Sequence, residues 1–315
     1  MIARGYRAAT LIDFETAFAE TPASKAGYKL PIISNELNMS QTLVESDTIT
    51  GSRNNAATGL GRIAVDGNIV VPADYRAMGY WLKAQFGAPT TKAADTLFQH
   101  VFKVVDDQPS MIIEKAFPDI GKYFHYKGCK LNTAKWEFGD DKQMTVEMAL
   151  MGAAREIATE TYNASAKSIL PNPISQNHTY VKLGGSESHI VKSGDFTLDG
   201  SLDGDQYVVG GGGVRGAIPE ELFGASGTIE ALFENTDTME LAQAGTTTSL
   251  EIGFKAGDGK TSLSFLFPEV QIQPHDASIS GPGGVSISFD WRAFYEKDSN
   301  ASLVVATLVN DVESY

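Results

Sequence analysis

The feature that most constrains the fold is a series of short strand-like segments whose order occurs twice along the chain. Phe102-Lys103 precedes Ser110-Met111 by the same number of residues as Phe254-Lys255 precedes Ser262-Leu263. Self-similarity of this kind indicates a repeated structural unit. We therefore predict two tandem copies of one β-rich domain, with the first domain and an N-terminal arm at residues 1–155, a linker at 156–180 and the second domain at 181–315.

The correspondence continues on both sides of this pair. Gly67-Asn68-Ile69 matches Gly227-Thr228-Ile229 after a small gap, and residues 145–148 match residues 286–289 in the same alternating phase. Any two β-rich halves share some features by chance. An ordered series of strand, helix, hairpin, strand, turn and strand is harder to obtain by chance, so the pattern favours duplication.

Each half contains one segment with helical rather than strand periodicity. Apolar residues from Tyr75 to Phe86 recur at helical spacing and Gly87 follows them, which predicts a helix with a glycine cap. A shorter helix is predicted at 236–244. Residues 61–71 alternate apolar and polar around Asp66-Gly67, which is compatible with either a kinked strand or a hairpin.

The composition supports a mainly-β globular protein. Hydrophobic residues make up 42% of the 315 residues and charged residues 20%, enough apolar surface to build a core. The 31 glycines, together with frequent Val, Ile, Thr and Phe, favour short strands joined by tight turns. Cys129 is the single cysteine, so no internal disulfide is possible, and the alternation around it predicts a buried thiol.

The charge and the termini limit the function classes. The formal net charge of −14 argues against attraction to nucleic acid, although it is compatible with DNA passing nearby. No apolar run follows the basic residues near the N-terminus, so no secretory signal is predicted. The apolar stretch at 303–309 is too short to span a bilayer. We therefore expect no membrane insertion, and folding in a cytoplasm.

No motif predicts an enzyme, a cofactor site or a metal site. Residues 199–205 resemble the start of a calcium-binding loop, but the twelfth position is Gly210 instead of glutamate, so an acidic turn is the better interpretation. Residues 210–213 are all glycine but lack the Lys-Ser/Thr pair of a phosphate-binding loop, and we expect a mobile loop. The histidines form no helical i, i+4 pair. We predict no catalytic residue, no cofactor and no metal.

Several segments nevertheless resemble a known family. They are residues 45–54 (ESDTITGSRN), residues 61–72 with the following Tyr-Arg-x-Met-Gly-x-Trp-Leu helix, Gln99-His100, residues 110–115, and residues 128–154 with their acidic turn. Together they resemble tail tube proteins of long-tailed, non-contractile phages. The resemblance covers most of residues 10–155 and is weaker over 185–310.

This resemblance implies a structural virion protein. Each domain would be a β-sandwich or half-open barrel with one flanking helix, and such domains join edge to edge around a channel. Rings would stack around a tape measure protein, end at the tail terminator and tail tip proteins, and later conduct DNA without binding it specifically. With two domains per chain, three chains would form a pseudo-hexameric ring. Six chains per ring remain the alternative.

The channel wall should repel DNA, because attractive contacts would slow a moving polyanion. Candidate channel-lining residues are Glu147 with the neighbouring Thr145, and Ser286, Ser288 and Asp290 in the second half. Alternation places the last three opposite the core-facing Ile287 and Phe289. The pattern alone equally permits these residues to face outer solvent.

Two further questions stay open at the level of sequence. Residues 1–50 and 156–178 are both long enough to bridge neighbouring rings, and the sequence does not rank them. Two other functions remain as alternatives: a β-sandwich module that binds carbohydrate or a host surface, and a secretion-type tube protein. A binding module would be expected to carry clusters of exposed aromatic residues in its loops.

Overall fold

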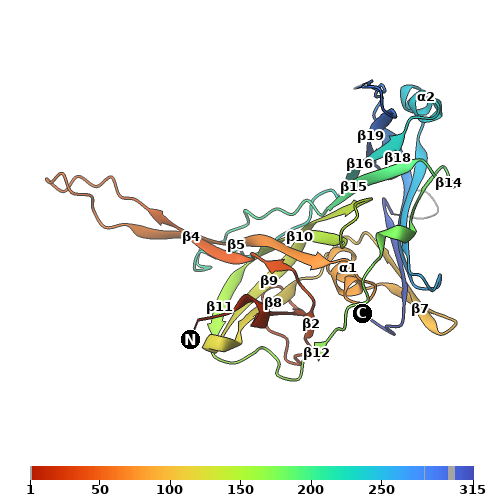
Figure 1. Ribbon diagram of the computed structural model, residues 1–315. Coiled ribbons are helices and arrows are strands. Elements are labelled where there is room, and N and C mark those ends of the chain that lie inside the picture. The colour runs from red at the N-terminus through yellow and green to blue at the C-terminus, as the bar shows by residue number, and fades with distance from the viewer. Residues whose placement is uncertain (1, 280, 297–301) are drawn as a thin grey trace.

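The structure is a computed structural model that describes residues 2–279, 281–296 and 302–315. The described residues form 20 connected strands and two α-helices, which confirms the predicted mainly-β fold. A long hairpin extends from one side of the body, and its tip lies far from the rest of the chain (Figure 1).

Most strands of the first half are short, but two of them are long enough to bend. Their bounds are β1 (Ala9–Phe14), β2 (Tyr28–Leu30), β3 (Ser34–Asn35), β4 (Asn38–Val44), β5 (Gly59–Pro72), β6 (Thr90–Ala94), β7 (Leu97–Lys103), β8 (Met111–Phe117), β9 (Lys122–Phe138), β10 (Thr145–Gly152), β11 (Ala154–Ala158) and β12 (Lys167–Ser168).

The second half has fewer strands. Their bounds are β13 (Thr179–Leu183), β14 (Ser186–Ser188), β15 (Val191–Asp199), β16 (Gly224–Leu232), β17 (Thr248–Lys255), β18 (Ser262–Ile272), β19 (Ser286–Ala293) and β20 (Val305–Asn310). The helices are α1 (Met78–Phe86) and α2 (Asp237–Gln243), with short 3-10 turns η1 (Gly5–Arg7), η2 (Pro118–Ile120) and η3 (Gln176–His178).

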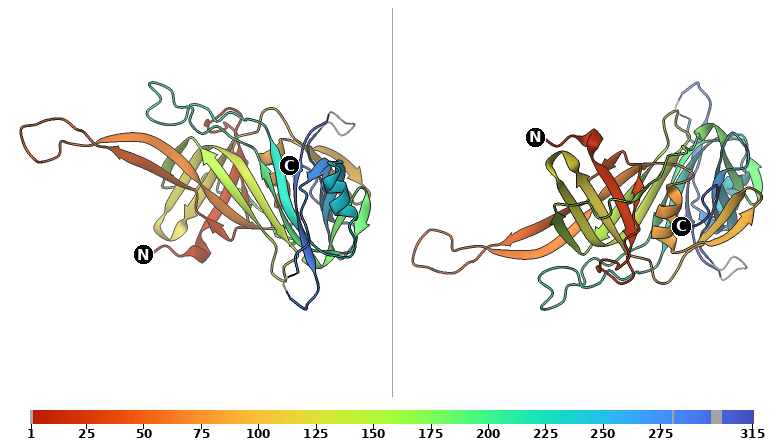
Figure 2. Two further views of the ribbon diagram at one scale, coloured as in Figure 1. Left: turned by 90° about the horizontal axis from the view of Figure 1, so that it is seen from above. Right: turned by 90° about the horizontal axis from the view of Figure 1, so that it is seen from below.

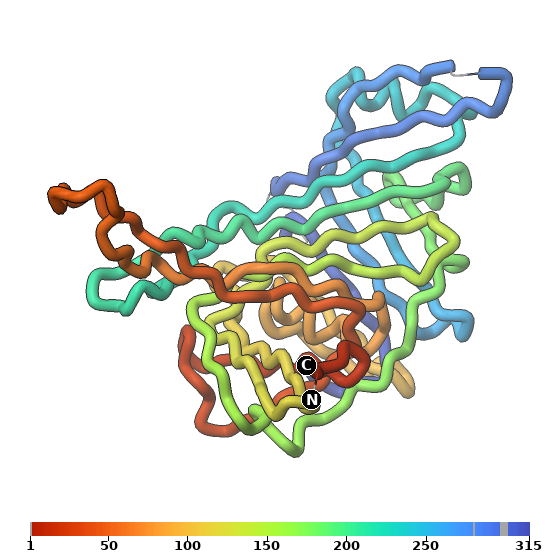
Figure 3. The backbone as a smooth tube through the Cα atoms, turned by 60° about the vertical axis from the view of Figure 1, so that its left-hand side comes forward, coloured from red at the N-terminus to blue at the C-terminus, as the bar shows by residue number. Residues whose placement is uncertain are grey.

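One continuous layer of strands runs through both halves, and we call it the first layer. Its order is β4, β5, β10, β9, β15, β16, β19 and the end of β18, all antiparallel. Figure 3 shows these strands side by side, from the orange hairpin through yellow and green to blue. Because β9 of the first half pairs directly with β15 of the second, the two halves share this sheet.

A second layer also crosses between the halves. Its order is β6, β7, β20, β18, β17, β13 and β14. The link is the pairing of β7 with β20, a strand from the other end of the chain. Two independent strand pairings therefore join the halves into one body.

The long strand β9 also connects the first layer to a smaller sheet. Its first part pairs with β8 and β11. Strand β8 also pairs with β1, and β1 pairs with β2. Gly128 has a φ of +66° within β9, a backbone conformation that favours glycine. Beyond it, the second part of β9 pairs with β10 and β15.

Aromatic side chains fill the space between the two main layers. Trp136 of β9 stacks on Phe196 of β15 with ring centroids 5.7 Å apart, and Phe196 lies 5.0 Å from Phe265 of β18. The buried core is contiguous across both halves. Offset and edge-to-face aromatic pairs add to the stabilisation from burial alone, so the core strengthens the junction between β9 and β15.

The first helix forms where its sequence pattern predicts, but it is buried on nearly every side. Asp74 accepts hydrogen bonds from the backbone N–H groups of Arg76 and Ala77 at the start of α1. The helix ends at Gly87, whose φ is +78° and whose N–H donates to the carbonyl oxygen of Lys83. Eight of its nine residues are buried. Helix α2, in contrast, buries only Ala242.

The ambiguous segment around Gly67 is a kinked strand rather than a hairpin, since β5 runs through it without turning. Gly67 has a φ of +150°, and a Cβ there would lie 2.5 Å from the carbonyl oxygen of Glu36. The long hairpin is instead formed by β4 and β5, with residues 45–58 at its tip (Figure 2).

Most of the segment 156–180 lies against the first half, while its last two residues begin β13 and pair with β17 of the second half. It begins within β11, and Tyr162 and Ile174 along it are buried. The backbone N–H of Asn172 donates to Asp74, so the same carboxylate holds both the segment and the start of α1. The division of the chain at this segment remains a prediction, because the two halves share both layers.

Candidate channel-facing sheet

The first layer has one face packed on the core and one open face, and the candidate residues lie on the open face. On β10, Val146 and Met148 are buried while Thr145 and Glu147 point the other way. On β19, Ile287 and Phe289 are buried, and Ser286, Ser288 and Asp290 alternate with them. The structure therefore places all five candidate residues on one face of one sheet, in two separate strands.

The strands between them add charged residues that sequence reasoning missed. Lys135 of β9 lies opposite Glu147 on one side and opposite Thr197 of β15 on the other. Glu137 lies opposite Asp195. Both strands alternate polar and apolar residues, so the sequence did contain the pattern that marks which of their residues face away from the core. Their position between β10 and β16 depends on the pairing of β9 with β15, which no local pattern indicates.

Acidic groups outnumber basic groups along this face. These charged side chains include Glu137, Glu147, Asp195, Glu230 and Asp290, with Lys135, Lys192 and Arg292. Lys135 pairs with Glu137 at 2.7 Å and Lys192 pairs with Glu230 at 2.5 Å. Within the described ranges, no cation lies within ion-pair distance of the three remaining acids. The open face therefore carries unbalanced negative charge.

The neighbouring acids affect one another's ionisation. Partial burial raises the pKa of Asp195, the nearby Lys135 opposes this shift, and the negative charges of Glu137 and Asp290 add to it. The hydrogen bond to Glu137 raises the pKa of Lys135. Burial is therefore the main reason that the pKa of Asp195 is raised, and the neighbouring acids add to it.

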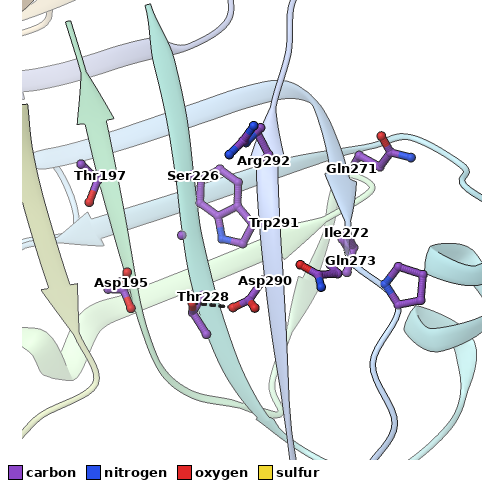
Figure 4. A pocket seen from close by; sticks show the side chains of 12 residues that line it. Asp195, Thr197, Ser226, Thr228, Gln271, Ile272, Gln273, Asp290, Trp291 and Arg292 are labelled. Atoms are coloured by element: carbon purple, nitrogen blue, oxygen red, sulfur yellow. Dashed lines mark hydrogen bonds between the residues drawn. The ribbon is translucent and has the colours of Figure 1, made fainter. Parts of the chain in front are cut away.

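An open polar hollow of about 520 Å³ lies on this face across β15, β16 and β19 (Figure 4). Asp195, Thr197, Ser226, Thr228, Asp290 and Arg292 line it. The Thr228 hydroxyl donates a hydrogen bond of 2.8 Å to Asp290. The hollow follows the strands and is open to solvent, so it is a feature of the open face rather than an enclosed pocket.

The acidic loop at 199–205 is held by hydrogen bonds from backbone N–H groups to its own carboxylates. Asp199 accepts a hydrogen bond from the backbone N–H of Ser201, and Asp203 accepts one from the N–H of Asp205. In the described part of the chain, no three His, Cys, Asp or Glu side chains lie close enough together to hold a metal ion. Cys129 is fully buried, as predicted, and burial raises the pKa of its thiol.

All three tryptophans, Trp81, Trp136 and Trp291, are buried, so none is available on a carbohydrate-binding surface. Neither helix in the described ranges is long and apolar enough to cross a membrane.

Comparison with known proteins gives one result that covers both halves. The family model described as phage tail tube protein matches residues 5–293. No curated protein matches the chain. The family match includes the long β4–β5 hairpin, both helices and every strand of the open face. Because it covers nearly the whole sequence, the chain belongs to the phage tail tube protein family.

Proposed function

We propose that three copies of this chain join into a ring, that rings stack into the tail tube, and that the open face of the first layer lines the channel. A single observation carries this proposal: one continuous sheet has a core-packed face and an acidic polar face, and it begins at β4, a strand that pairs on one side only. Exposed sheet edges favour pairing with another chain, and a ring gives this edge a partner in every copy.

The charge of the open face suits a conduit for DNA. A cationic wall would bind phosphates and release counterions, which would hold the DNA in place. A wall bearing Glu147, Asp195 and Asp290 without paired cations would keep the duplex away from the surface. The ion pairs of Lys135 and Lys192 leave few free positive charges to bind phosphate.

The other partners follow from the role of a tube subunit. Before DNA passes, a tape measure protein would occupy the channel, and terminator and tip proteins would close the two ends of the tube. Assembly would take place in the cytoplasm of the bacterial host. The function is structural, so no catalytic step is part of this proposal.

Contacts between stacked rings are best assigned to the β4–β5 arm. Its apolar side chains are exposed, with Ile49 at 96% and Leu60 at 71%. The glycine-rich loop of the second half lies beside the base of this arm, where the backbone N–H of Ile63 donates to the carbonyl oxygen of Gly213. Val209 on that loop is also fully exposed. A neighbouring ring would cover these apolar groups.

Thiol labelling tests which face lines the channel. Glu147→Cys places a thiol on the open face, while Glu187→Cys places one on exposed β14 of the second layer. In isolated subunits, both thiols should react with a small maleimide and with a bulky polymer-linked maleimide. In assembled tubes, the bulky reagent should label position 187 and not position 147, since the polymer cannot enter the channel.

The small reagent is the internal control, because it should still reach position 147 through the open ends of the tube. Equal labelling of both positions by the bulky reagent in intact tubes would show that the acidic face is on the outside. Electron microscopy of the labelled sample verifies that tubes are present.

A further inference from the structure

The two halves of the chain correspond at the level of strand register. In the first half, Ile69 of β5 lies opposite Met148 of β10, and in the second half Ile229 of β16 lies opposite Phe289 of β19. Two positions earlier on the first strand of each pair, Gly67 lies opposite Leu150 and Gly227 lies opposite Trp291. The equivalent residues are those that the sequence repeat aligns.

The two glycines also face equivalent backbone. A Cβ on Gly67 would lie 2.5 Å from the carbonyl oxygen of Glu36, and a Cβ on Gly227 would lie 2.1 Å from that of Asp195. Each glycine thus permits the same close approach of a neighbouring strand. Glu36 and Asp195 therefore occupy equivalent positions in the two halves.

This equivalence extends along the neighbouring strand. Asn35 lies opposite Ile69 as Gly194 lies opposite Ile229. Leu37 and Phe196 are both fully buried. The segment 34–40, which contains β3 and the start of β4, is therefore the counterpart of β15.

The next strand along the layer differs between the halves. Within the chain, β15 pairs with residues 133–138 of β9. Leu131 opposite Leu150 corresponds to Ile272 opposite Trp291. The pairing of β9 with β10 shifts by one residue just past Leu131. Counted along the chain from Leu131 and Ile272, residues 274–279 correspond to residues 133–138. These residues follow β18, are assigned to no strand, and are paired with no other described strand. Ile279 is 83% exposed, whereas the equivalent Phe138 is 4% exposed.

We propose that residues 274–279 of one copy form a strand against residues 35–40 of the next copy, in the register by which β9 pairs with β15. This inference rests on the proposed ring. It identifies the strand pairing that joins neighbouring copies, which we call the seam. It places Asp276 opposite Asn38, Ser278 opposite Glu36 and Ala277 opposite Leu37. No two like charges lie opposite one another, and Ile279 gains the cover that Phe138 has inside the chain.

Among the described residues, the edge at 35–40 has no strand partner on the side away from β5, and an incoming strand would replace two side-chain bonds that Leu37 makes there. The backbone N–H of Glu36 donates to Asn68 of β5, so the peptide groups of Leu37 point to the other edge. There the side chains of Asn35 and Lys115, rather than a strand, bond to them. Pro274, which has no N–H, stands at the first position of the incoming strand, where proline is tolerated.

Cysteine pairs test this register in the assembled protein. Asn38→Cys with Asp276→Cys joins residues predicted to be opposite, a separation of about 4.5–5.5 Å that a disulfide can bridge. Lys135→Cys with Thr197→Cys is the template pair within one chain. Asn38→Cys with Ser278→Cys is the control, since a diagonal pair is roughly 7–8 Å apart. Cys129 stays in place because it is fully buried.

After mild oxidation of assembled tubes, the in-register pair should give a covalent ladder on denaturing gels, with at least about tenfold more product than the diagonal pair. The ladder should end at three chains. The template pair should close within the monomer, and the single-cysteine variants should give no ladder.

The outcomes separate this inference from the ring itself. If rings are seen by electron microscopy but the diagonal pair cross-links as well as the in-register pair, or neither does, the seam is wrong and the ring stands. If the unsubstituted protein forms no ring at high concentration, the proposed function and the seam both fail. A ladder that continues to six chains would support the seam and overturn the trimer.

Discussion

At the scale of single residues, Arg215 is the side chain that most directly links the two halves. Its guanidinium is 7% exposed and donates to both carboxylate oxygens of Asp66, at 2.7 and 3.0 Å. It also donates to the carbonyl oxygens of Val65, Gly152 and Gly204. One side chain from the glycine-rich loop thus satisfies acceptors on β5, at the end of β10 and within its own loop.

We expect Arg215→Ala to lower the free energy of unfolding by about 3 kcal/mol, because it leaves several acceptors without their donor. Arg215→Lys should recover only part of this loss, since an ammonium group cannot reproduce the planar fork. Chemical denaturation measures both changes.

The matched control is Arg53→Ala on the exposed arm, which should change stability by no more than about 0.5 kcal/mol. Equal stability of the Arg215→Ala and Arg53→Ala variants would mean that the buried guanidinium contributes nothing net to the link between the halves.

At the scale of elements, α1 is held by a segment distant in sequence. Tyr315 packs against Tyr80 with ring centroids 4.9 Å apart, and its hydroxyl donates to the carbonyl oxygen of Arg76. A Cβ on Gly79 would lie 2.1 Å from the Tyr315 ring. Gly79 is therefore present for close packing, even though glycine disfavours a helix interior.

We expect Gly79→Ala to lower the free energy of unfolding by about 1–3 kcal/mol, because the new methyl group displaces the Tyr315 ring. In a Tyr315→Ala background the same change should be neutral or stabilise by up to about 1 kcal/mol, since alanine is the better helix former. A double-mutant cycle by thermal denaturation measures the coupling. The same cost in both backgrounds would show that the ring is not the obstacle.

The elements also show where local patterns suffice. The spacing from Tyr75 to Phe86 and the glycine after it predicted α1 almost to its ends, because capping and helical periodicity act within a few residues. The alternation on β10 and β19 likewise placed Glu147 and Asp290 opposite the core. No local pattern indicated that Tyr315 would pack on α1, since that contact joins residues far apart in the chain.

At the scale of the whole molecule, the arm is the feature that a single subunit does not explain. Val44 and Gly59 lie opposite each other as the last strand pair before its tip, so a two-residue turn can replace residues 45–58 without changing the strands. Apolar side chains of the arm are exposed in the single subunit, Ile49 most of all.

We expect the variant with Asn-Gly in place of residues 45–58 to form rings but not long tubes, because it retains the sheet edges and loses the contacts between rings. Electron microscopy and sedimentation distinguish the two assemblies. The single substitution Ile49→Ser, which retains the length of the arm, should shorten the tubes less. Tubes of normal length from the shortened variant would exclude the arm as the contact between rings.

The sequence by itself determined the features that depend on near neighbours: the mainly-β class, the buried Cys129 and the alternation that sets Glu147 and Asp290 apart from the core. It also carried the family resemblance that the match over residues 5–293 confirms. The hairpin expected in both halves forms only between β17 and β18, since β7 pairs with β6 and β20 while β8 pairs with β1 and β9.

Only the tertiary structure decided that β9 pairs with β15 and β7 with β20, so that the halves share two layers and one acidic face. These pairings join strands separated by long stretches of chain. Their register depends on which faces are buried together and on close approaches such as those at Gly67 and Gly227. Such contacts form only when the whole core assembles, so no window of the sequence contains them.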